Sequence, residues 1–344
     1  MTTAAATPGL DIERLTQWLP AHVDGLRAPL RFARIGDGQS NLTFLVEGGE
    51  RSVVLRRPPL GETLESAHDM QRERRVLSAL AGAGVTVPRP LASCEDAAVT
   101  GAPFFVMEHV EGQVLTSRAA AEALPEAGRR RAAFGLVDAL VQLQAVDVDA
   151  AGLSDFRRER SYAARQLRRW QKQWDASRGD DAPGVVDAVG ARLAAALPLT
   201  EDSVLVHGDY HFGNVLTGPA GELRALLDWE LCTVGDPLAD VGLMVVYYTE
   251  LGHPAGRPDG VFREPVTTLP GFPTTGELVA AYAAATGRDV APLQWWVAFG
   301  YWKVAIILQG VYARWRNNPA NGSGASALGA AVERVAGLAA AAAG

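Results

Sequence analysis

Three oxygen-bearing side chains at fixed spacing, Asp209, Asn214 and Asp228, are the residues of this sequence best suited to catalysis. Asp209 follows His207 by two positions, and four residues separate it from Asn214. This order of His, Asp, Asn and a later Asp is typical of ATP-dependent phosphoryl transfer. There a carboxylate orients the acceptor hydroxyl, while an amide oxygen and a second carboxylate hold Mg²⁺, which prefers oxygen ligands. The spacing therefore predicts Asp209 as the catalytic base and Asn214 and Asp228 as magnesium ligands.

Short apolar segments flank these residues and would position them. Residues 203–206 are expected to form a strand that ends just before the motif, and residues 215–227 a hairpin with a Gly-rich turn. Such a hairpin would bring Asn214 and Asp228 close together at the ends of paired strands. The alternative is a polar turn between strands of an unrelated α/β protein.

A glycine-containing turn near the N-terminus is a candidate for phosphate binding. Residues 34–46 are predicted to form a strand, a tight turn with Gly36 and Gly38, and a second strand. Glycines let the backbone approach a phosphate closely, and Ser40 and Asn41 could add hydrogen-bond donors. Because the third glycine of G-x-G-x-x-G is replaced by Asn41, an ordinary hairpin explains this segment about as well.

Arg56, at the end of the next predicted strand, is expected to reach the α- and β-phosphates. Residues 53–56 stand where kinases have V-A-I-K, whose lysine pairs with a glutamate on the following helix. That helix is predicted from about residue 66 to residue 80, and Glu73 is the candidate partner. A guanidinium can bind a phosphate and a carboxylate together. With Arg57 adjacent, a surface arginine at the strand end is the alternative.

The strand expected at residues 103–108 would lead into a hinge between two lobes. Backbone groups from Met107 to His109 are expected to hydrogen-bond the adenine of the nucleotide. The sequence thus predicts an N-terminal lobe of residues 1–109, with the nucleotide-binding sheet and helix. Residues 110–344 would form the second lobe, with the catalytic loop, the metal site and the substrate-binding helices.

The composition of the chain disfavours several classes of protein. Its 344 residues are enough for two domains, and 48% hydrophobic with 21% charged residues is ordinary for a globular protein. A net charge of −7 offers no basic footprint for nucleic acid. Two cysteines, Cys94 and Cys232, are too few for a disulfide framework or a zinc site. Without a recognisable secretion signal or an apolar run approaching 18 residues, a cytoplasmic protein without a membrane span is expected.

Together these elements resemble the aminoglycoside phosphotransferase-like (APH), or choline kinase-like, branch of the protein kinase-like fold. The resemblance covers roughly residues 30–315 and includes Asp236–Asp240. It implies an α+β, bilobal protein with a small antiparallel β-sheet in the N-terminal lobe and a larger, mostly helical C-terminal lobe. It also implies ATP and Mg²⁺ as cofactors, and structural roles for His207 and Asp240 in bracing the catalytic loop.

Within that family, three segments look most similar to the acyl-CoA-dehydrogenase-associated phosphotransferases: G-x-S-N at residues 38–41, V-L-R-R-P-P at 54–59 and D-W-E at 228–230. Those proteins are taken to act on hydroxylated acyl-CoA compounds. The arginine at position 56 departs from the lysine of the wider family but resembles this subgroup.

A basic and aromatic segment is the candidate acceptor site. Residues 155–178 hold eight basic and three acidic residues, a net charge of +5 in an acidic protein. On a helix, one face would carry Tyr162, Arg165, Gln166, Arg169, Trp170, Gln173 and Trp174. Such a face could stack on a ring and bind anionic groups, or it could be a solvated basic helix whose tryptophans pack on the core. The candidate substrate residues are Tyr162, Arg165, Arg169 and Trp170.

The sequence thus predicts transfer of the γ-phosphate of ATP to a hydroxyl of a small molecule, with a hydroxyacyl-CoA as first choice. The alternatives are an aminoglycoside, choline or amino-sugar kinase, and a non-catalytic nucleotide-binding pseudokinase, which the arginine at position 56 favours. Residues 291–344 contain a single acid, Glu333, which disfavours a polycationic acceptor. Both ATP and GTP satisfy these motifs, residues 252–273 are a candidate lid, and no oligomeric state is assigned.

Overall fold

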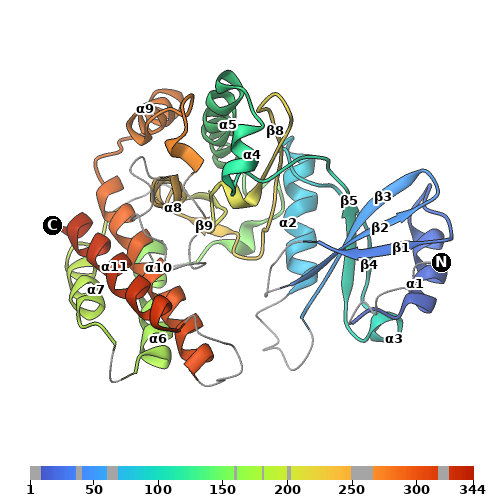
Figure 1. The fold of residues 1–344 in the computed structure, drawn as a ribbon, viewed down its shortest axis with the longest axis horizontal. Coiled ribbons are helices and arrows are strands. Elements are labelled where there is room, and N and C mark those ends of the chain that lie inside the picture. The colour runs from blue at the N-terminus through green and yellow to red at the C-terminus, as the bar shows by residue number, and fades with distance from the viewer. Residues whose placement is uncertain are drawn as a thin grey trace. The chain divides into compact units, whose positions relative to one another are not determined.

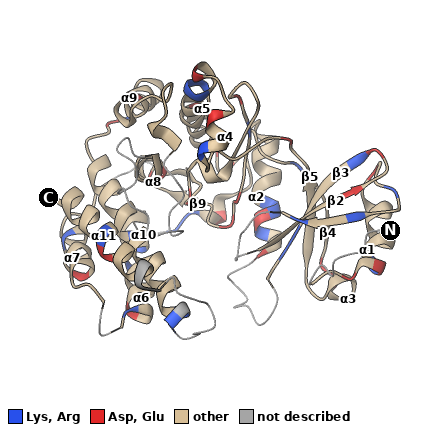
Figure 2. Ribbon diagram, in the orientation of Figure 1, with Lys and Arg blue, Asp and Glu red and all other residues tan. Residues whose placement is uncertain are grey.

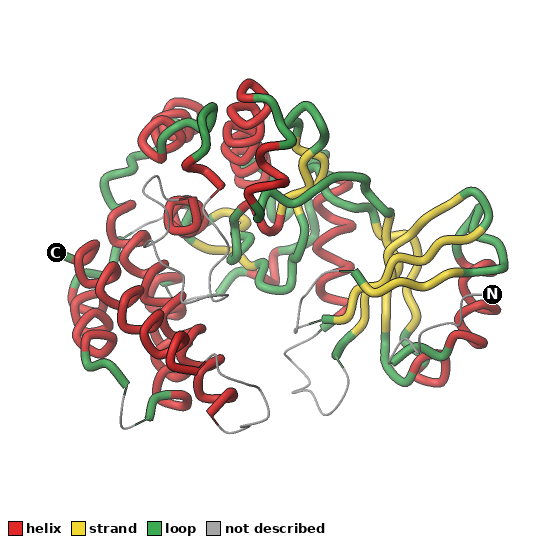
Figure 3. Tube along the Cα trace, in the orientation of Figure 1, coloured by secondary structure: helices red, strands yellow, loops and turns green. Residues whose placement is uncertain are grey.

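The computed structural model of the chain (Figure 1) describes residues 9–35, 41–59, 69–158, 161–179, 182–199, 203–248, 266–316 and 325–344. It divides into two compact units. Unit 1 consists of Met1–Glu111 and Ala225–Glu230, and unit 2 of Gly112–Arg224 and Leu231–Gly344. The first unit combines a β-sheet with helices and the second is mainly helical (Figure 3), which is the α+β architecture expected from the sequence.

Unit 1 is built around a five-stranded antiparallel sheet of order β1-β2-β3-β5-β4. Its strands are β1 (Arg31–Arg34), β2 (Leu42–Gly48), β3 (Arg51–Arg57), β4 (Pro90–Cys94) and β5 (Phe104–Glu108). Every second residue of β2 from Leu42 to Val46 is buried, because alternate side chains of a strand point to one face. Strand β3 lies in the middle of the sheet, and three consecutive residues, Val53 to Leu55, are buried there.

Three helices accompany this sheet, namely α1 (Ile12–His22), α2 (Met70–Gly82) and α3 (Ala97–Thr100). Helix α2 begins where Asp69 caps it by accepting a hydrogen bond from the backbone of Arg72 at 2.9 Å. Its buried residues recur every three or four positions, and Glu73 is one of them. The helix was predicted from about residue 66, and residues 60–68 lie outside the described part of the chain.

Ala225–Glu230 groups with unit 1 although it belongs to the second half of the chain. The backbone N–H of Leu226 donates to the carbonyl of Thr86 at 2.9 Å, and Asn41 Nδ2 donates to Glu230 Oε2 at 3.1 Å. The division predicted from the sequence was contiguous, and the structure differs from it at this segment. As a result, Asp228 shares a unit with Arg56 and Glu73.

Unit 2 is mainly helical. Its helices are α4 (Arg118–Glu122), α5 (Glu126–Gln144), η1 (Ser154–Phe156), α6 (Tyr162–Ser177), α7 (Val185–Ala195), η2 (Phe212–Asn214), α8 (Leu238–Tyr248), η3 (Val266–Thr268), α9 (Thr275–Thr286), α10 (Leu293–Arg316) and α11 (Ala325–Ala343). Helix α10 is central, since it contacts α6, α7, α8 and α11. Helix α8 is almost free of charge and carries only Asp240 (Figure 2), which makes that carboxylate conspicuous.

Two short β-ladders flank the predicted catalytic loop. Strand β6 (Val204–Val206) pairs antiparallel with β9 (Thr233–Gly235), and β7 (Val215–Thr217) pairs with β8 (Leu223–Leu226). The turn of the second ladder closes with a hydrogen bond from Gly218 N–H to Glu222 O at 2.8 Å. The strand before His207 and the hairpin after Asn214 are therefore present as predicted.

None of the helices in the described part of the chain is long and apolar enough to cross a membrane.

Candidate active site

The loop that carries Asp209 leaves strand β6 and is held by a buried carboxylate of α8. Asp240, which is 0% exposed, accepts the backbone N–H of His207 at 2.7 Å and that of Gly208 at 2.9 Å. One carboxylate thus satisfies two consecutive backbone donors. The bracing contact implied by the family resemblance is seen directly.

Gly208 gives the loop a conformation that other residues would resist. Its φ is +86°, in the left-handed region that glycine occupies without steric cost. A Cβ atom at this position would lie 3.0 Å from both the Cβ and the carbonyl oxygen of Leu231. A tight turn therefore precedes Asp209.

The carboxylate of Asp209 lies among hydrogen-bond donors. Asn214 Nδ2 donates to Asp209 Oδ2 at 3.1 Å and to its carbonyl oxygen at 2.8 Å. His211 Nε2 lies 3.3 Å from the same Oδ2. Because Gly213 N–H donates to His211 Nδ1 at 2.9 Å, a neutral His211 ring carries its proton on Nε2 and donates it to Asp209.

These surroundings keep Asp209 ionised. Burial opposes the charge, but the hydrogen bond from His211 and the charge of Lys303 are among the effects that outweigh it, so the pKa of Asp209 lies well below its usual range. The side chain is nevertheless 31% exposed. Asp209 is thus an accessible carboxylate that accepts hydrogen bonds at neutral pH, as a base that orients a hydroxyl must.

The hydrogen bonds of Asn214 to Asp209 use its side-chain nitrogen and leave its side-chain oxygen available. Its amide nitrogen is used by Asp209, whereas its Oδ1 has no hydrogen-bond partner among the residues that the structure describes. An amide oxygen held in this way is a suitable hard ligand for a cation such as Mg²⁺.

In unit 1, Arg56 lies among three carboxylates. Its Nε donates to Glu73 Oε2 at 3.0 Å, its Nη2 donates to Asp228 Oδ1 at 2.5 Å, and Glu230 Oε2 lies 3.9 Å from Nη2. Burial disfavours the charge of Arg56, but these three carboxylates outweigh it and raise its pKa. Three acids around one buried base leave net negative charge, which a metal cation would neutralise.

The structure decides which of the two neighbouring arginines faces this cluster. Arg57 points elsewhere, because its Nη1 donates to the carbonyl of Thr100 at 2.8 Å. Arg56, which is 11% exposed, contacts Glu73, the partner expected from the sequence.

Asp228 has an unusual backbone. Its φ is +64°, and it is the one non-glycine residue with positive φ among those described. Such a conformation costs an L-residue free energy, although aspartate tolerates it better than most. Since Arg56 occupies Oδ1, the second carboxylate oxygen remains available to a ligand.

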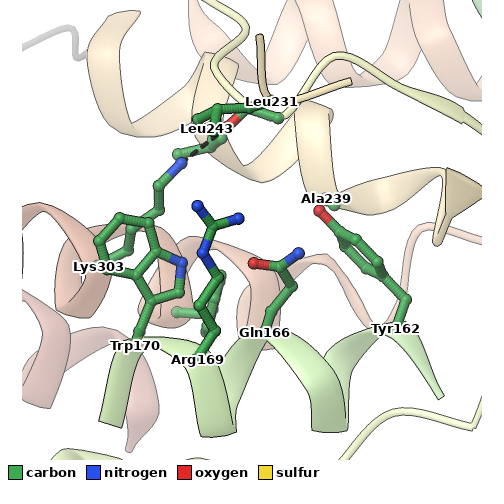
Figure 4. A pocket seen from close by; sticks show the side chains of 10 residues that line it. Tyr162, Gln166, Arg169, Trp170, Leu231, Ala239, Leu243 and Lys303 are labelled. Atoms are coloured by element: carbon green, nitrogen blue, oxygen red, sulfur yellow. Dashed lines mark hydrogen bonds between the residues drawn. The ribbon is translucent and has the colours of Figure 1, made fainter. Parts of the chain in front are cut away.

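A pocket in unit 2 (Figure 4) lies beside the catalytic loop. Helix α6 contributes Tyr162, Gln166, Arg169 and Trp170 to its lining, α8 contributes Ala239 and Leu243, and α10 contributes Phe299 and Lys303. Gly208 and Leu231, which lie in loops, also line the pocket. Among the residues that the structure describes, no carboxylate belongs to this lining. Three of the four predicted substrate residues thus share one pocket. The fourth, Arg165, is not part of the lining and instead donates to Val234 O at 3.3 Å.

Sequence reasoning missed one residue of this region, Lys303. It is 4% exposed, and its Nζ donates to the carbonyl of Gly208 at 2.7 Å. The available signal was its isolation, because Lys303 is the only charged residue between Leu293 and Ala313. A lone lysine in an apolar helix needs a partner, since an unpaired buried charge is costly.

Comparison with known proteins identifies the family. The family model APH, described as "Phosphotransferase enzyme family", matches residues 31–296. The chain belongs to this family. It is 36% identical over 319 residues to acyl-CoA dehydrogenase family member 10 of Mus musculus. The aligned region covers 90% of this chain and 29% of that protein. This chain therefore spans less than a third of that relative's length.

Solved structures of APH proteins share the fold. A provisionally named aminoglycoside phosphotransferase of Ralstonia eutropha is 30% identical, with a TM-score of 0.79 over 97% of this chain and 98% of that one. The GDP complex of aminoglycoside 2′-phosphotransferase-IIIa has a TM-score of 0.61 over 94% and 96% of the two chains. At 16% identity, the second likeness shows the kinase-like fold alone.

The predicted nucleotide-binding residues of this APH chain are all in unit 1. Ser40, with the Gly36–Gly38 turn, lies outside the described residues, whereas Asn41 is described and bonds to Glu230. Met107 is buried on β5, and His109 is exposed directly after it. Their roles in binding nucleotide stay predictions. Most of the candidate lid, residues 252–265, also lies outside the described residues.

The Arg56 cluster leads to a prediction about stability. Burial first, and the charge of Asp228 next, raise the pKa of Glu73 to about 6 against the opposing charge of Arg56, from an ordinary value of 4.5. Between these pH values the folded protein binds more protons than the unfolded chain. The contribution of Glu73 to the free energy of unfolding is therefore fully present below about pH 4.5 and is lost as the pH rises through 6. The shift in the pKa of Glu73 corresponds to about 2 kcal/mol.

Replacing Glu73 with glutamine should remove this pH dependence. The difference in unfolding free energy between wild type and Glu73→Gln should change by about 2 kcal/mol between pH 4.5 and pH 7. Urea denaturation at both pH values measures it, with Glu95→Gln as an exposed control in the same unit. Parallel pH profiles for wild type and Glu73→Gln would contradict the prediction.

Proposed function

We propose that this chain transfers the γ-phosphoryl group of ATP to a hydroxyl of a small molecule, with Asp209 as the catalytic base. The observation that carries the proposal is the ionised, partly exposed carboxylate of Asp209, held beside Asn214 on a loop that Asp240 braces. A carboxylate in this state can accept the proton of an acceptor hydroxyl as the phosphorus–oxygen bond forms.

Asn214 and Asp228 are the proposed magnesium ligands. Each has an oxygen without a hydrogen-bond partner among the described residues, and Asp228 belongs to a cluster with excess negative charge. When bound, Mg²⁺ would neutralise phosphate oxygens of the nucleotide. Arg56 donates a hydrogen bond to Asp228 and, as a planar fork, is suited to add a phosphate contact.

The remaining nucleotide contacts are proposed from the family pattern. Ser40 and Asn41 would bind phosphate, Glu73 would hold Arg56, and backbone groups from Met107 to His109 would bind the base. Acceptance of a guanine nucleotide is the alternative to ATP, since the aminoglycoside 2′-phosphotransferase-IIIa structure contains GDP.

For the acceptor, we propose a hydroxyacyl-CoA. The support is twofold: similarity to acyl-CoA dehydrogenase family member 10 over 90% of this chain, and a pocket whose described lining has two cationic residues and no carboxylate. An aminoglycoside, choline or amino-sugar acceptor is the second candidate, favoured by the name of the Ralstonia eutropha neighbour. Acidic side chains would be needed around such cations, and the described residues that line this pocket include none. The presence of Asp209, Asn214 and Asp228 together argues against a pseudokinase.

A coupled assay for ADP release tests the proposed function. Wild-type protein should release ADP from ATP in the presence of Mg²⁺ and an acceptor, and excess EDTA should reduce the rate to background. The acceptor panel comprises hydroxyacyl-CoAs of different chain length, choline, an aminoglycoside and an amino sugar. Phosphorylated product, identified by mass spectrometry, establishes the acceptor class. If no acceptor raises ADP release above background, the chain is not the proposed transferase.

A further inference from the structure

Lys303 places a buried ammonium group at the pocket, and some of its N–H donors have no hydrogen-bond acceptor among the described residues. An ammonium has three N–H donors, and among the described residues Lys303 Nζ has a single hydrogen-bond acceptor, the carbonyl of Gly208. Buried polar groups almost always find partners, because leaving a donor unsatisfied costs free energy. The remaining donors therefore need an oxygen atom from elsewhere.

Neighbouring protein charges stabilise Lys303 without satisfying these donors. Burial lowers the pKa of Lys303, and the charges of Asp209 and Asp240 oppose that effect. Neither carboxylate is hydrogen-bonded to Nζ in the described part of the chain. Both carboxylates accept hydrogen bonds from other groups: Asp240 from two backbone N–H groups, and Asp209 from Asn214.

A second cation, Arg169, lies near the same tryptophan ring as Lys303. The Lys303 ammonium lies 5.4 Å from the centre of the Trp170 ring, and the Arg169 guanidinium lies 5.8 Å from it. Figure 4 shows Arg169, Gln166 and Tyr162 reaching from α6 into the same space as Lys303. This side of the pocket thus offers donors and positive charge.

The remaining side chains of the described lining are apolar. They belong to Leu231, Ala239, Leu243 and Phe299. An occupant that fits both the polar and the apolar lining carries an oxygen group at one place and hydrocarbon beside it, which describes an acyl group. Gly208 lines the same pocket and directly precedes Asp209 in the sequence. An occupant of the pocket would therefore lie next to the catalytic loop.

We infer that this pocket binds the acyl group of the phosphoryl acceptor, with its oxygen hydrogen-bonded to Lys303 and facing Arg169. The inference rests on the proposed function and names the group by which the acceptor is recognised. Two sources supply the same chemistry, the carboxylate of a free hydroxy acid and the carbonyl of its CoA thioester. Cationic acceptors such as choline are excluded, because the pocket would place their charge against Lys303 and Arg169.

Binding without turnover tests the inference independently of catalysis. Free hydroxy acids of several chain lengths and their CoA thioesters are titrated calorimetrically into the protein without ATP. The variants are Lys303→Met, which removes the buried donors, and Arg169→Gln, which changes an exposed side chain at the pocket. Lys172→Met, an exposed lysine on the same helix outside the pocket lining, is the matched control.

We expect the dissociation constant of at least one acyl probe to rise tenfold or more in Lys303→Met and severalfold in Arg169→Gln, and to stay within twofold of wild type in Lys172→Met. Binding of the free acid alone identifies a carboxylate, and binding of the thioester alone identifies a carbonyl. Should Lys303→Met not fold, Arg169→Gln decides.

Two results would overturn the inference. One is unchanged acyl binding in Arg169→Gln together with unchanged binding in any folded Lys303→Met. The other is a choline or aminoglycoside probe that binds more tightly than every acyl probe. Failure of the proposed function is separate, since it would appear as absent ADP release with every acceptor, whatever the titrations show.

Discussion

Replacing Asp209 with alanine should lower the turnover number by about a thousandfold or more while nucleotide binding is retained. The variant removes the carboxylate that accepts hydrogen bonds from Asn214 and His211, and with it the proposed route for the hydroxyl proton. General-base catalysis contributes roughly 10²–10⁴ in rate, and the loss of loop order around Asn214 adds to that. Binding should survive, because the proposed direct contacts to the nucleotide lie in unit 1 and the proposed magnesium ligands Asn214 and Asp228 are unchanged.

The measurement combines initial rates with nucleotide affinity. ADP release is followed at saturating ATP and acceptor, and the ATP dissociation constant is measured by calorimetry. Asp138→Ala is the matched control, because Asp138 is an exposed aspartate of α5 in the same unit. Turnover within tenfold of wild type would show that another group takes the proton.

Replacing Asp240 with alanine should destabilise the protein by about 3–5 kcal/mol. The buried carboxylate accepts two consecutive backbone N–H groups and contributes negative charge near Lys303. Alanine would leave both donors unsatisfied and weaken the compensation of a buried ammonium. Asp240→Asn should be intermediate, since its amide has one oxygen for two donors.

Chemical denaturation of unit 2, followed by tryptophan fluorescence, measures this loss, with Asp138→Asn as the exposed control. The turnover number of Asp240→Asn should also fall, because the loop before Asp209 loses one of its two anchors. If Asp240→Ala unfolded at nearly the wild-type denaturant concentration, water would have to satisfy both donors, and the bracing role would be lost.

Local patterns explain why much of the site was predictable from the sequence. The strand before His207 and the hairpin after Asn214 are short apolar runs bounded by turn residues, and the structure contains both. The pairing of Arg56 with Glu73 also followed from order along the chain, a strand and then a helix. The family was identified from the same motifs, which the comparison bears out.

Long-range contacts explain what was missed. Lys303 is 95 residues from Gly208, and Asn41 is 189 residues from Glu230, so no local spacing reveals either contact. Helical periodicity placed Arg165 and Arg169 on one broad face of α6. Only the packing of α6 against α10 and β9 decides that Arg169, and not Arg165, lines the pocket.

The left-handed backbone at Asp228 has a consequence for engineering. Glycine would adopt this conformation without strain, but it would also remove the carboxylate that Arg56 contacts, and a buried arginine that loses a hydrogen-bond partner is destabilising. In the proposed enzyme, a search for stabilising substitutions guided by backbone angles alone would choose glycine at position 228 and would thereby remove a proposed magnesium ligand.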